Sequence, residues 1–300
     1  MTMEGKIALV TGSTGGIGKE TARQLAELGA GVILVGRNPD RAEAAAAELR
    51  RATANDEVMA LPADLSRLGD VHRLARQLAD RADRLDVLIN NAGAARSQRE
   101  LTEDGIETAF AVNVVAPFCL THWLLPVLIN SPQARVINIA GGVPRGPIDL
   151  DNLQGEKSYV GLSFYNQTKL ASMAMSYRFA EELAGTDISV NSAYPGHAYT
   201  SMNQDLPTEA YPAVARPIVP LLRRAMPVLY GRRALINATR SSVSLASGSE
   251  VRTGSYVNSK ASPARWPRAV LDQNTRDTIW DLCERLRDRW VLSQKSPAVG

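Results

Sequence analysis

The stretch Ile7-Ala-Leu-Val-Thr-Gly-Ser-Thr-Gly-Gly-Ile-Gly18 decides the fold, because it joins a short apolar run to a glycine-rich turn. Ile7–Val10 has the length and apolarity of a buried strand, and Ile17–Leu28 has the apolar spacing of a helix. Glycines allow a tight turn and let backbone N–H groups approach a phosphate at the helix amino terminus. A purely structural turn is the alternative, but the strand before and the helix after favour dinucleotide binding. We therefore assign cofactor contacts to Gly12, Ser13, Thr14, Gly16, Ile17 and Gly18.

Short apolar runs alternate with longer amphipathic stretches along the rest of the chain. The predicted strands are Ile7–Val10, Val32–Val35, Val58–Leu61, Val87–Ile89, Val136–Ile139, Ile188–Ala193 and, at an edge, Ser255–Asn258. The predicted helices are Ile17–Leu28, Arg41–Arg51, Val71–Ala82, a region from about Gly105 to Ile129 that Pro117 and Pro126 should bend or interrupt, Tyr165–Leu183 and Ala234–Ala246. This alternation predicts an α/β fold, a doubly wound (Rossmann), mostly parallel seven-stranded sheet with helices on both faces. We expect a single domain over residues 1–300.

Composition narrows the function classes. The net charge is +3 and the basic residues are scattered, which does not indicate a nucleic-acid binder. No apolar run approaches the roughly 20 residues of a membrane span, and the few polar residues before Lys6 leave no room for a signal peptide. Cys119 and Cys283 are expected to be thiols in a reducing compartment rather than a disulfide. We expect a cytoplasmic protein with no membrane partner.

Residues after the second, third and fourth strands extend the predicted cofactor site. Gly36 occupies the position of the acidic residue typical of NAD sites, and Arg37 follows it, so a guanidinium can pair with a 2′-phosphate. This favours NADP(H), the alternative being an ordinary charge at a strand end. Asp64 and Leu65 are placed near the adenine ring, although Asp64 can equally cap the helix that begins near Arg67. The short residues Asn91, Ala92 and Gly93 allow a close approach to the cofactor.

Tyr165 and Lys169 lie four residues apart at the start of a helical pattern, so both side chains are expected to project into one cleft. A nearby ammonium favours the phenolate and lowers the pKa of a tyrosine, which suits proton transfer. A half-buried aromatic residue beside a solvated charge is the alternative for so short a pattern.

These motifs together resemble the short-chain dehydrogenase/reductase family in order and spacing over residues 5–260. The motifs are Thr11–Gly18, Asp64, Asn90–Gly93, Asn113, Tyr165 with Lys169, and Pro195-Gly196. The segment Asp151-Asn-Leu-Gln-Gly-Glu-Lys-Ser-Tyr is similar to the branch that contains retinol dehydrogenases.

The resemblance implies a role for each matching residue. Tyr165 becomes the general acid/base, and Lys169 lowers its pKa and binds the nicotinamide ribose. Asn113 matches the asparagine that anchors a water linking the lysine to solvent, and Pro195 and Gly196 contact the nicotinamide end. A hydride is then expected to move between the nicotinamide and the substrate carbonyl carbon.

The chain departs from the family pattern at the fifth strand, where a serine pair is replaced by Ala140 and Gly141. Losing one preorganised donor to the substrate oxygen typically costs about 3 kcal/mol, which weakens redox activity without excluding it. The candidate substitutes are Ser163, which should face away, His197, and a hydroxyl on the substrate. Gly141 and His197 are therefore the predicted substrate contacts.

The region after Gly196 is long and rich in Pro, Leu, Met and Arg, and the family resemblance makes residues 197–233 a substrate lid. Its apolar residues favour a bulky lipophilic or aromatic substrate, the alternative being that they fill the core beneath the lid. A helical tail over about 272–292 carries an apolar stripe, either against its own domain or in a homo-oligomer contact.

The sequence thus predicts an NADP(H)-dependent oxidoreductase that reduces a carbonyl or oxidises an alcohol on such a substrate. Two alternatives stay open. The same cleft can run non-redox chemistry as a cyclase, dehydratase or rearrangement enzyme, or the chain can bind NADP without catalysis.

Overall fold

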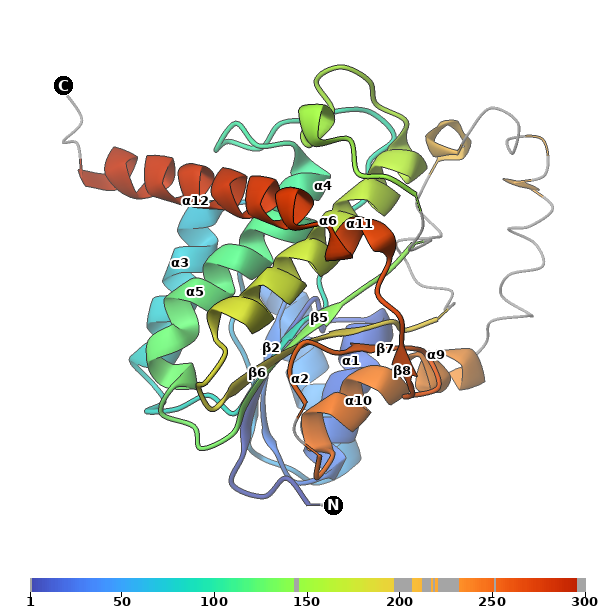
Figure 1. The fold of residues 1–300 in the computed structure, drawn as a ribbon. Coiled ribbons are helices and arrows are strands. Elements are labelled where there is room, and N and C mark those ends of the chain that lie inside the picture. Colours follow the sequence, from blue (N-terminus) through green and yellow to red (C-terminus); the bar gives the residue numbers. More distant parts are fainter. Residues whose placement is uncertain are drawn as a thin grey trace, which may run out of the picture.

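Eight strands form one sheet in the computed structural model, which describes residues 2–142, 146–196, 207–211, 217, 219–220, 232–250 and 252–295 (Figure 1). The strands are β1 (Ile7–Thr11), β2 (Gly31–Val35), β3 (Val58–Ala60), β4 (Val87–Asn90), β5 (Ala134–Ile139), β6 (Ile188–Ala193), β7 (Tyr256–Val257) and β8 (Pro263–Ala264). Their order across the sheet is β3-β2-β1-β4-β5-β6-β7-β8. The strand order reverses direction between β1 and β4, which is the place where doubly wound sheets bind ligands.

The sheet confirms the predicted fold class but has one strand more than predicted. All neighbouring strands are parallel except β7 and β8, which pair antiparallel through Val257 and Pro263. A two-residue strand that contains a proline gives no periodic signal, and proline is tolerated there because the strand lies at the sheet edge.

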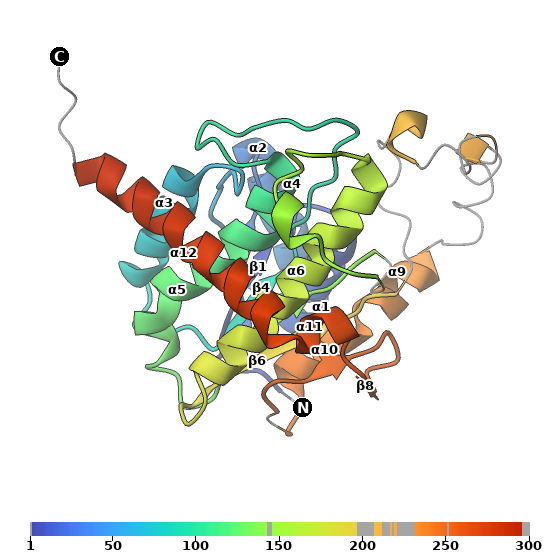
Figure 2. The same cartoon turned by 45° about the horizontal axis from the view of Figure 1, so that its top comes forward.

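Helices cover both faces of the sheet, as predicted (Figures 1 and 2). The helices are α1 (Gly16–Glu27), α2 (Pro39–Thr53), α3 (Leu68–Ala79), α4 (Thr108–Phe110), α5 (Ala116–Leu128), α6 (Gly161–Glu182), α9 (Arg232–Ala238), α10 (Arg240–Ser247), α11 (Arg268–Leu271) and α12 (Gln273–Lys295). The helical turns are η1 (Ala111–Val115), η2 (Leu150–Asn152) and η3 (Thr208–Ala210). Helices α1, α2 and α10 contribute to the smaller apolar cluster on one face, while α3, α5, α6 and α12 contribute to the larger one on the other.

The long predicted helix around residues 105–129 is continuous but changes its winding. After α4, the turn η1 is a π-helix, and Pro117 falls in the first turn of α5. A wider turn fits a proline because proline offers no N–H and its ring crowds the preceding turn. Pro126 lies within α5 near its end.

Among the described residues, one helical segment, Thr108–Leu128, is long and apolar enough to cross a membrane by composition alone. Its most apolar window is 72% buried inside the protein, as expected for a core helix. The sequence reading missed this segment because Asn113 and Thr121 interrupt its apolar run.

The tail packs on its own domain, which is one of the two placements predicted for it. Helix α12 lies across α6 and reaches α5 and α3 (Figure 2). The Trp280 ring sits between Phe118 and Phe179, with centroid distances of 5.0 and 4.7 Å. Both cysteines, Cys119 in α5 and Cys283 in α12, are free and buried, as predicted.

Candidate active site

The glycine-rich turn between β1 and α1 is locked against the loop that follows β4. Gly12 has a φ of +63°, and a Cβ on it would lie 2.8 Å from the Cα of Ala92. A Cβ on Gly18 would overlap the amide of Asn91 and the carbonyl of Gly12. The Asn91 amide donates to the Thr11 carbonyl at 2.8 Å. Both glycines are therefore required by close backbone approach.

The amino terminus of α1 is free of side-chain caps. Gly15 is its N-cap, the first turn carries no acidic residue, and a Cβ on Gly15 would meet no atom within 4 Å. Thr14, Gly16 and Ile17 are half-buried around this opening. The first backbone N–H groups of a helix have no partner within the helix, so an uncapped amino terminus suits a phosphate.

The Ser13 hydroxyl makes hydrogen bonds within the protein. Its hydroxyl donates to the Val10 carbonyl at 2.7 Å and accepts from the Val35 N–H at 3.0 Å, and its own N–H donates to the Val35 carbonyl. Ser13 thus ties β1 to β2 beneath the turn, and its side chain is fully buried.

The end of β2 has no room for an acidic side chain. A Cβ on Gly36 would overlap the Thr14 methyl group. Arg37 is exposed, and no hydrogen bond or ion pair to another described residue holds its guanidinium. The pair therefore presents a free cation where an NAD site would present a carboxylate.

Asp64 lies just before α3 but does not cap it, so the alternative role predicted for this residue is wrong. One carboxylate oxygen accepts from the Ser66 N–H at 3.0 Å and the Ser66 hydroxyl at 2.7 Å, which forms a turn just before α3. The N-cap position itself belongs to Arg67. Leu65 is half-buried against the larger apolar cluster.

Tyr165 and Lys169 converge at the end of β5. Their side chains are 7% and 4% exposed, and a Cβ on Gly141 would lie 2.8 Å from the Tyr165 hydroxyl oxygen and 3.3 Å from the Lys169 Cε. On the other side, a Cβ on Gly93 would lie 3.5 Å from the Lys169 Nζ. The Nζ donates to the Ile139 carbonyl at 3.1 Å. The predicted meeting of the phenol and the ammonium in one place is therefore present.

The predicted lowering of the Tyr165 pKa is wrong for the protein alone. Burial raises the pKa of Tyr165 well above its usual value, and the nearby phenol of Tyr194 adds to the increase. Burial also lowers the pKa of Lys169 to about 8. The prediction considered the attraction of the ammonium but not the loss of water, which disfavours the charged form of both groups.

Asn113 is a buried clamp in the π-turn η1. Its amide oxygen accepts from the Ala94 N–H at 2.8 Å, and its amide nitrogen donates to the Ala94 carbonyl at 2.9 Å and the Thr168 hydroxyl at 2.8 Å. The Thr168 hydroxyl in turn donates to the Tyr165 carbonyl at 2.8 Å. Asn113 thus joins the loop after β4 to the helical turn that carries Tyr165 and Lys169, which we call the dyad. Thr168 was missed because a threonine inside a helix gives no signal of its own.

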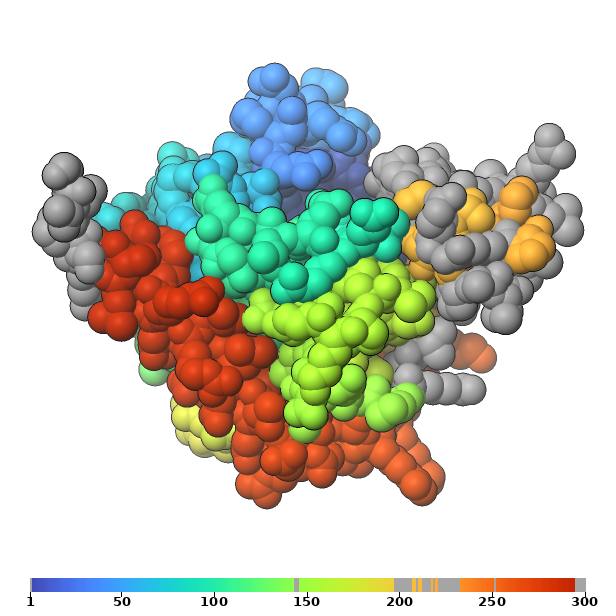
Figure 3. Space-filling model, turned by 90° about the horizontal axis from the view of Figure 1, so that it is seen from above, coloured from blue at the N-terminus to red at the C-terminus, as the bar shows by residue number. Residues whose placement is uncertain are grey.

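Pro195 and Gly196 follow β6, at the same carboxyl ends of the parallel strands as Gly93 and Gly141. Gly196 has a φ of +76°, and a Cβ on it would lie 2.9 Å from the Ser259 Cβ. Ser163 is exposed, which matches the expectation that it faces away from the dyad. His197 lies outside the described residues, as does most of the predicted lid over 197–233. Seen from above, the segment around residues 94–107 lies beside the segment that leads into α6 (Figure 3).

The sequence model of the short chain dehydrogenase family matches residues 6–210. The chain belongs to the short-chain dehydrogenase/reductase family. Retinol dehydrogenase 14 of Homo sapiens is 32% identical over 298 residues, which cover 94% of this chain and 86% of that protein. Retinol dehydrogenase 13 of Homo sapiens is 38% identical over 205 residues, which cover 68% of this chain and 62% of that protein. This short-chain dehydrogenase/reductase is thus an oxidoreductase of the retinol-dehydrogenase-like branch, as the motifs predicted.

Solved structures agree with this assignment. An uncharacterised protein from Mycobacterium paratuberculosis has a TM-score of 0.73 and 28% identity, covering 95% of this chain and 94% of that one. The Pseudomonas aeruginosa RhlG/NADP active-site complex has a TM-score of 0.65 and 30% identity, covering 87% of this chain and 96% of that one.

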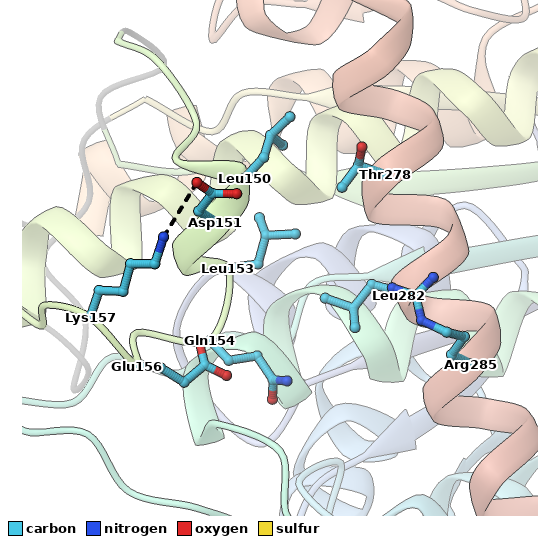
Figure 4. Close-up of a pocket in the computed structure, with 9 residues that line it drawn as sticks. All are labelled: Leu150, Asp151, Leu153, Gln154, Glu156, Lys157, Thr278, Leu282 and Arg285. Atoms are coloured by element: carbon cyan, nitrogen blue, oxygen red, sulfur yellow. Dashed lines mark ion pairs between the residues drawn. The ribbon is translucent and has the colours of Figure 1, made fainter.

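A surface hollow of about 310 Å³ in this short-chain dehydrogenase/reductase lies elsewhere, between η2 and α12 (Figure 4). An ion pair between Lys157 and Asp151, 3.3 Å long, stands on its rim. The residues that line it are Leu150, Asp151, Leu153, Gln154, Glu156, Lys157, Thr278, Leu282 and Arg285. None of them belongs to the candidate active site.

Proposed function

We propose that this oxidoreductase uses NADP(H) to reduce a carbonyl group on a bulky lipophilic compound, or to oxidise the corresponding alcohol. The observation that carries the proposal is the convergence of the Tyr165 hydroxyl and the Lys169 side chain over Gly141, with the Lys169 Nζ beside Gly93. The phenol and the ammonium thus lie together at the ends of β4 and β5, next to the point between β1 and β4 where the strand order reverses, which suits a proton donor and a cation acting on one substrate.

The residues of the candidate site fit a dinucleotide that carries a 2′-phosphate, as NADP does. Gly12 and Gly18 keep the turn tight, and the uncapped amino terminus of α1 suits the pyrophosphate. The free guanidinium of Arg37 suits a 2′-phosphate, and the Thr14 methyl excludes an acid at Gly36. The NADP named in the RhlG complex supports the same cofactor.

When bound, NADPH supplies the hydride. Tyr165 would give its proton to the carbonyl oxygen as the carbonyl carbon gains that hydride and the π bond opens. The substrate would thereby become an alcohol, with both electrons supplied by the cofactor, and Tyr165 would recover a proton from solvent. Lys169 stabilises the phenolate that exists between these proton transfers.

The substrate class rests on two observations. The relatives named above are retinol dehydrogenases, and retinol is a long apolar alcohol. In the described part of the predicted lid, the apolar residue Ala210 is fully buried and its Cβ lies 3.2 Å from where a Cβ on Gly161 would be. Gly161 begins the helix that carries Tyr165.

The direct test follows NADPH consumption with all-trans-retinal and, as a small polar comparison, acetaldehyde. Tyr165→Phe is expected to lower kcat by about 10²–10⁴-fold, the usual contribution of a general acid. Tyr177→Phe removes one hydroxyl from the same helix at its Trp266 contact, away from the dyad, and is the matched control. Equal rates for Tyr165→Phe and wild type would remove Tyr165 from the chemistry.

The cofactor proposal has its own test. Arg37→Ser is expected to raise the KM for NADPH by about 10- to 100-fold, because a charge-assisted hydrogen bond contributes about 1.5–3 kcal/mol. The KM for NADH should stay within about threefold. If both values rise together, Arg37 supports the loop rather than the phosphate. The comparisons do not favour the non-redox or non-catalytic alternatives.

A further inference from the structure

The end of β5 lacks the hydroxyl that would normally assist Tyr165. Ala140 and Gly141 carry none, and the Tyr165 hydroxyl already lies 2.8 Å from where a Cβ on Gly141 would be. A serine side chain at residue 141 therefore has no room unless Tyr165 moves. A second donor to the reacting oxygen, where the protein itself supplies one, comes from another element.

The neighbouring strand places a phenol there. Ile139 pairs with Ala193, and the Ala140 N–H donates to the Ala193 carbonyl at 2.9 Å, so Tyr194 follows beside Ala140. The Tyr194 N–H donates to the Val257 carbonyl at 2.8 Å. Its carbonyl accepts from the Ser241 hydroxyl at 3.0 Å. The backbone of Tyr194 is thus fixed on both sides.

The side chain of Tyr194 lies on the face of the sheet that α6 covers. It packs against the larger apolar cluster, which includes Leu170 and Met173 of α6. The strand register sets Tyr194 beside Ala140, and the next residue, Gly141, lies against the Tyr165 hydroxyl, so Tyr194 and Tyr165 reach the end of β5 from two different elements. Tyr194 also adds to the rise in the pKa of Tyr165 and of Tyr256 that burial begins.

We propose that Tyr194 is a second catalytic phenol, which donates a hydrogen bond to the substrate oxygen in place of the hydroxyl missing at residue 141. The proposal rests on the proposed function and deepens it. Tyr194 transfers no proton in this scheme, since the proton comes from Tyr165. Its hydrogen bond strengthens as negative charge develops on the oxygen, which is how an oxyanion donor lowers a barrier.

The kinetic test compares Tyr194→Phe with Tyr256→Phe. Both variants keep their rings, and each loses one hydroxyl from the same cluster, but only Tyr194 is assigned to the reacting oxygen. We expect kcat with NADPH and all-trans-retinal to fall by about 10²–10³-fold in Tyr194→Phe, while KM changes by less than about threefold. Tyr256→Phe should keep kcat within about threefold of wild type. A kcat within about threefold of wild type for Tyr194→Phe overturns the proposal, as does an equal loss in both variants.

A structural test separates this inference from the proposed function. A crystal of the wild-type protein with NADP⁺ and acetophenone should show the Tyr194 hydroxyl within about 3.2 Å of the ketone oxygen. If the wild type oxidises no NADPH but this contact is present, the redox proposal fails and the role of Tyr194 as hydrogen-bond donor to the substrate oxygen stands. If the Tyr194 hydroxyl lies beyond hydrogen-bonding distance of the ketone oxygen in an ordered complex, Tyr194 does not donate to the substrate and the inference is refuted.

Discussion

The buried ammonium of Lys169 should make the free energy of unfolding depend on pH in a specific way. Burial lowers the pKa of Lys169 from 10.5 to about 8 in the folded protein. Between these two values the unfolded chain binds the proton and the folded chain does not, so stability rises with pH. The penalty of holding the charged lysine in a dry site is fully present below about pH 8 and is lost as the pH rises towards 10.5.

The size of this effect follows from the same two values. At about 1.36 kcal/mol for each pKa unit, the interval from 10.5 to about 8 corresponds to about 3 kcal/mol. Roughly 2 kcal/mol of this is regained between about pH 8 and pH 10, because the unfolded lysine is still mostly protonated at pH 10. The 4% exposure of Lys169 leaves little solvent to screen the effect.

Urea unfolding of the cofactor-free protein from about pH 7 to pH 10 measures this change in the free energy of unfolding. Lys169→Met keeps the apolar stem and removes the titrating group, so the stability difference between wild type and variant should shift by about 2 kcal/mol in favour of wild type from pH 8 to pH 10. Lys157→Met, at a lysine whose side chain is 61% exposed, is the control for removing an ammonium at the surface. A difference for Lys169→Met that stays constant with pH would refute the reasoning, because it would mean that water reaches the ammonium.

Four further substitutions test the glycine-rich turn and the hydrogen bonds of Asn113. Gly36→Asp should destabilise the fold by about 1–3 kcal/mol instead of switching the cofactor to NADH, because its Cβ would overlap Thr14; urea unfolding and titration with both cofactors check this. Gly18→Ala should lose a similar amount of stability because of the Gly12 carbonyl, whereas Gly15→Ala, which faces open space, should change stability by less than about 0.5 kcal/mol. Asn113→Ala should lose about 2–4 kcal/mol through three broken hydrogen bonds and unpaired partners, and hydrogen exchange at Ala94 should become faster.

Local patterns in the sequence were enough to predict the architecture. The apolar runs of β1, β2 and β4 sit in a sheet whose faces are both covered, so continuous apolarity and strand length were sufficient evidence. The i, i+4 spacing of Tyr165 and Lys169 fixed their shared face once α6 formed. Features that depend on a single pairing at an edge, such as β8, carry no such pattern.

The parts of the site that escaped prediction depend on distances between elements. The pKa of Tyr165 follows from how completely α6 is covered, which no local pattern reveals. The structural role of Ser13 requires β2 to lie beside β1. The role proposed for Tyr194 depends on the register of β5 with β6, which sets this residue next to Ala140. Spacing therefore identifies the residues of one element, while the chemistry of the site arises from the meeting of several.

The pKa changes of the dyad bear on the direction of reaction. Reduction needs a protonated phenol, and burial favours that form of Tyr165 still further by raising its pKa. Oxidation needs the phenolate, which burial disfavours and which only positive charge nearby can recover. Lys169 supplies such a charge below its pKa of about 8, and an oxidised nicotinamide would add another. The dry site at Gly141 is thus suited to giving a proton when the bound nicotinamide is neutral and to accepting one when it is positive.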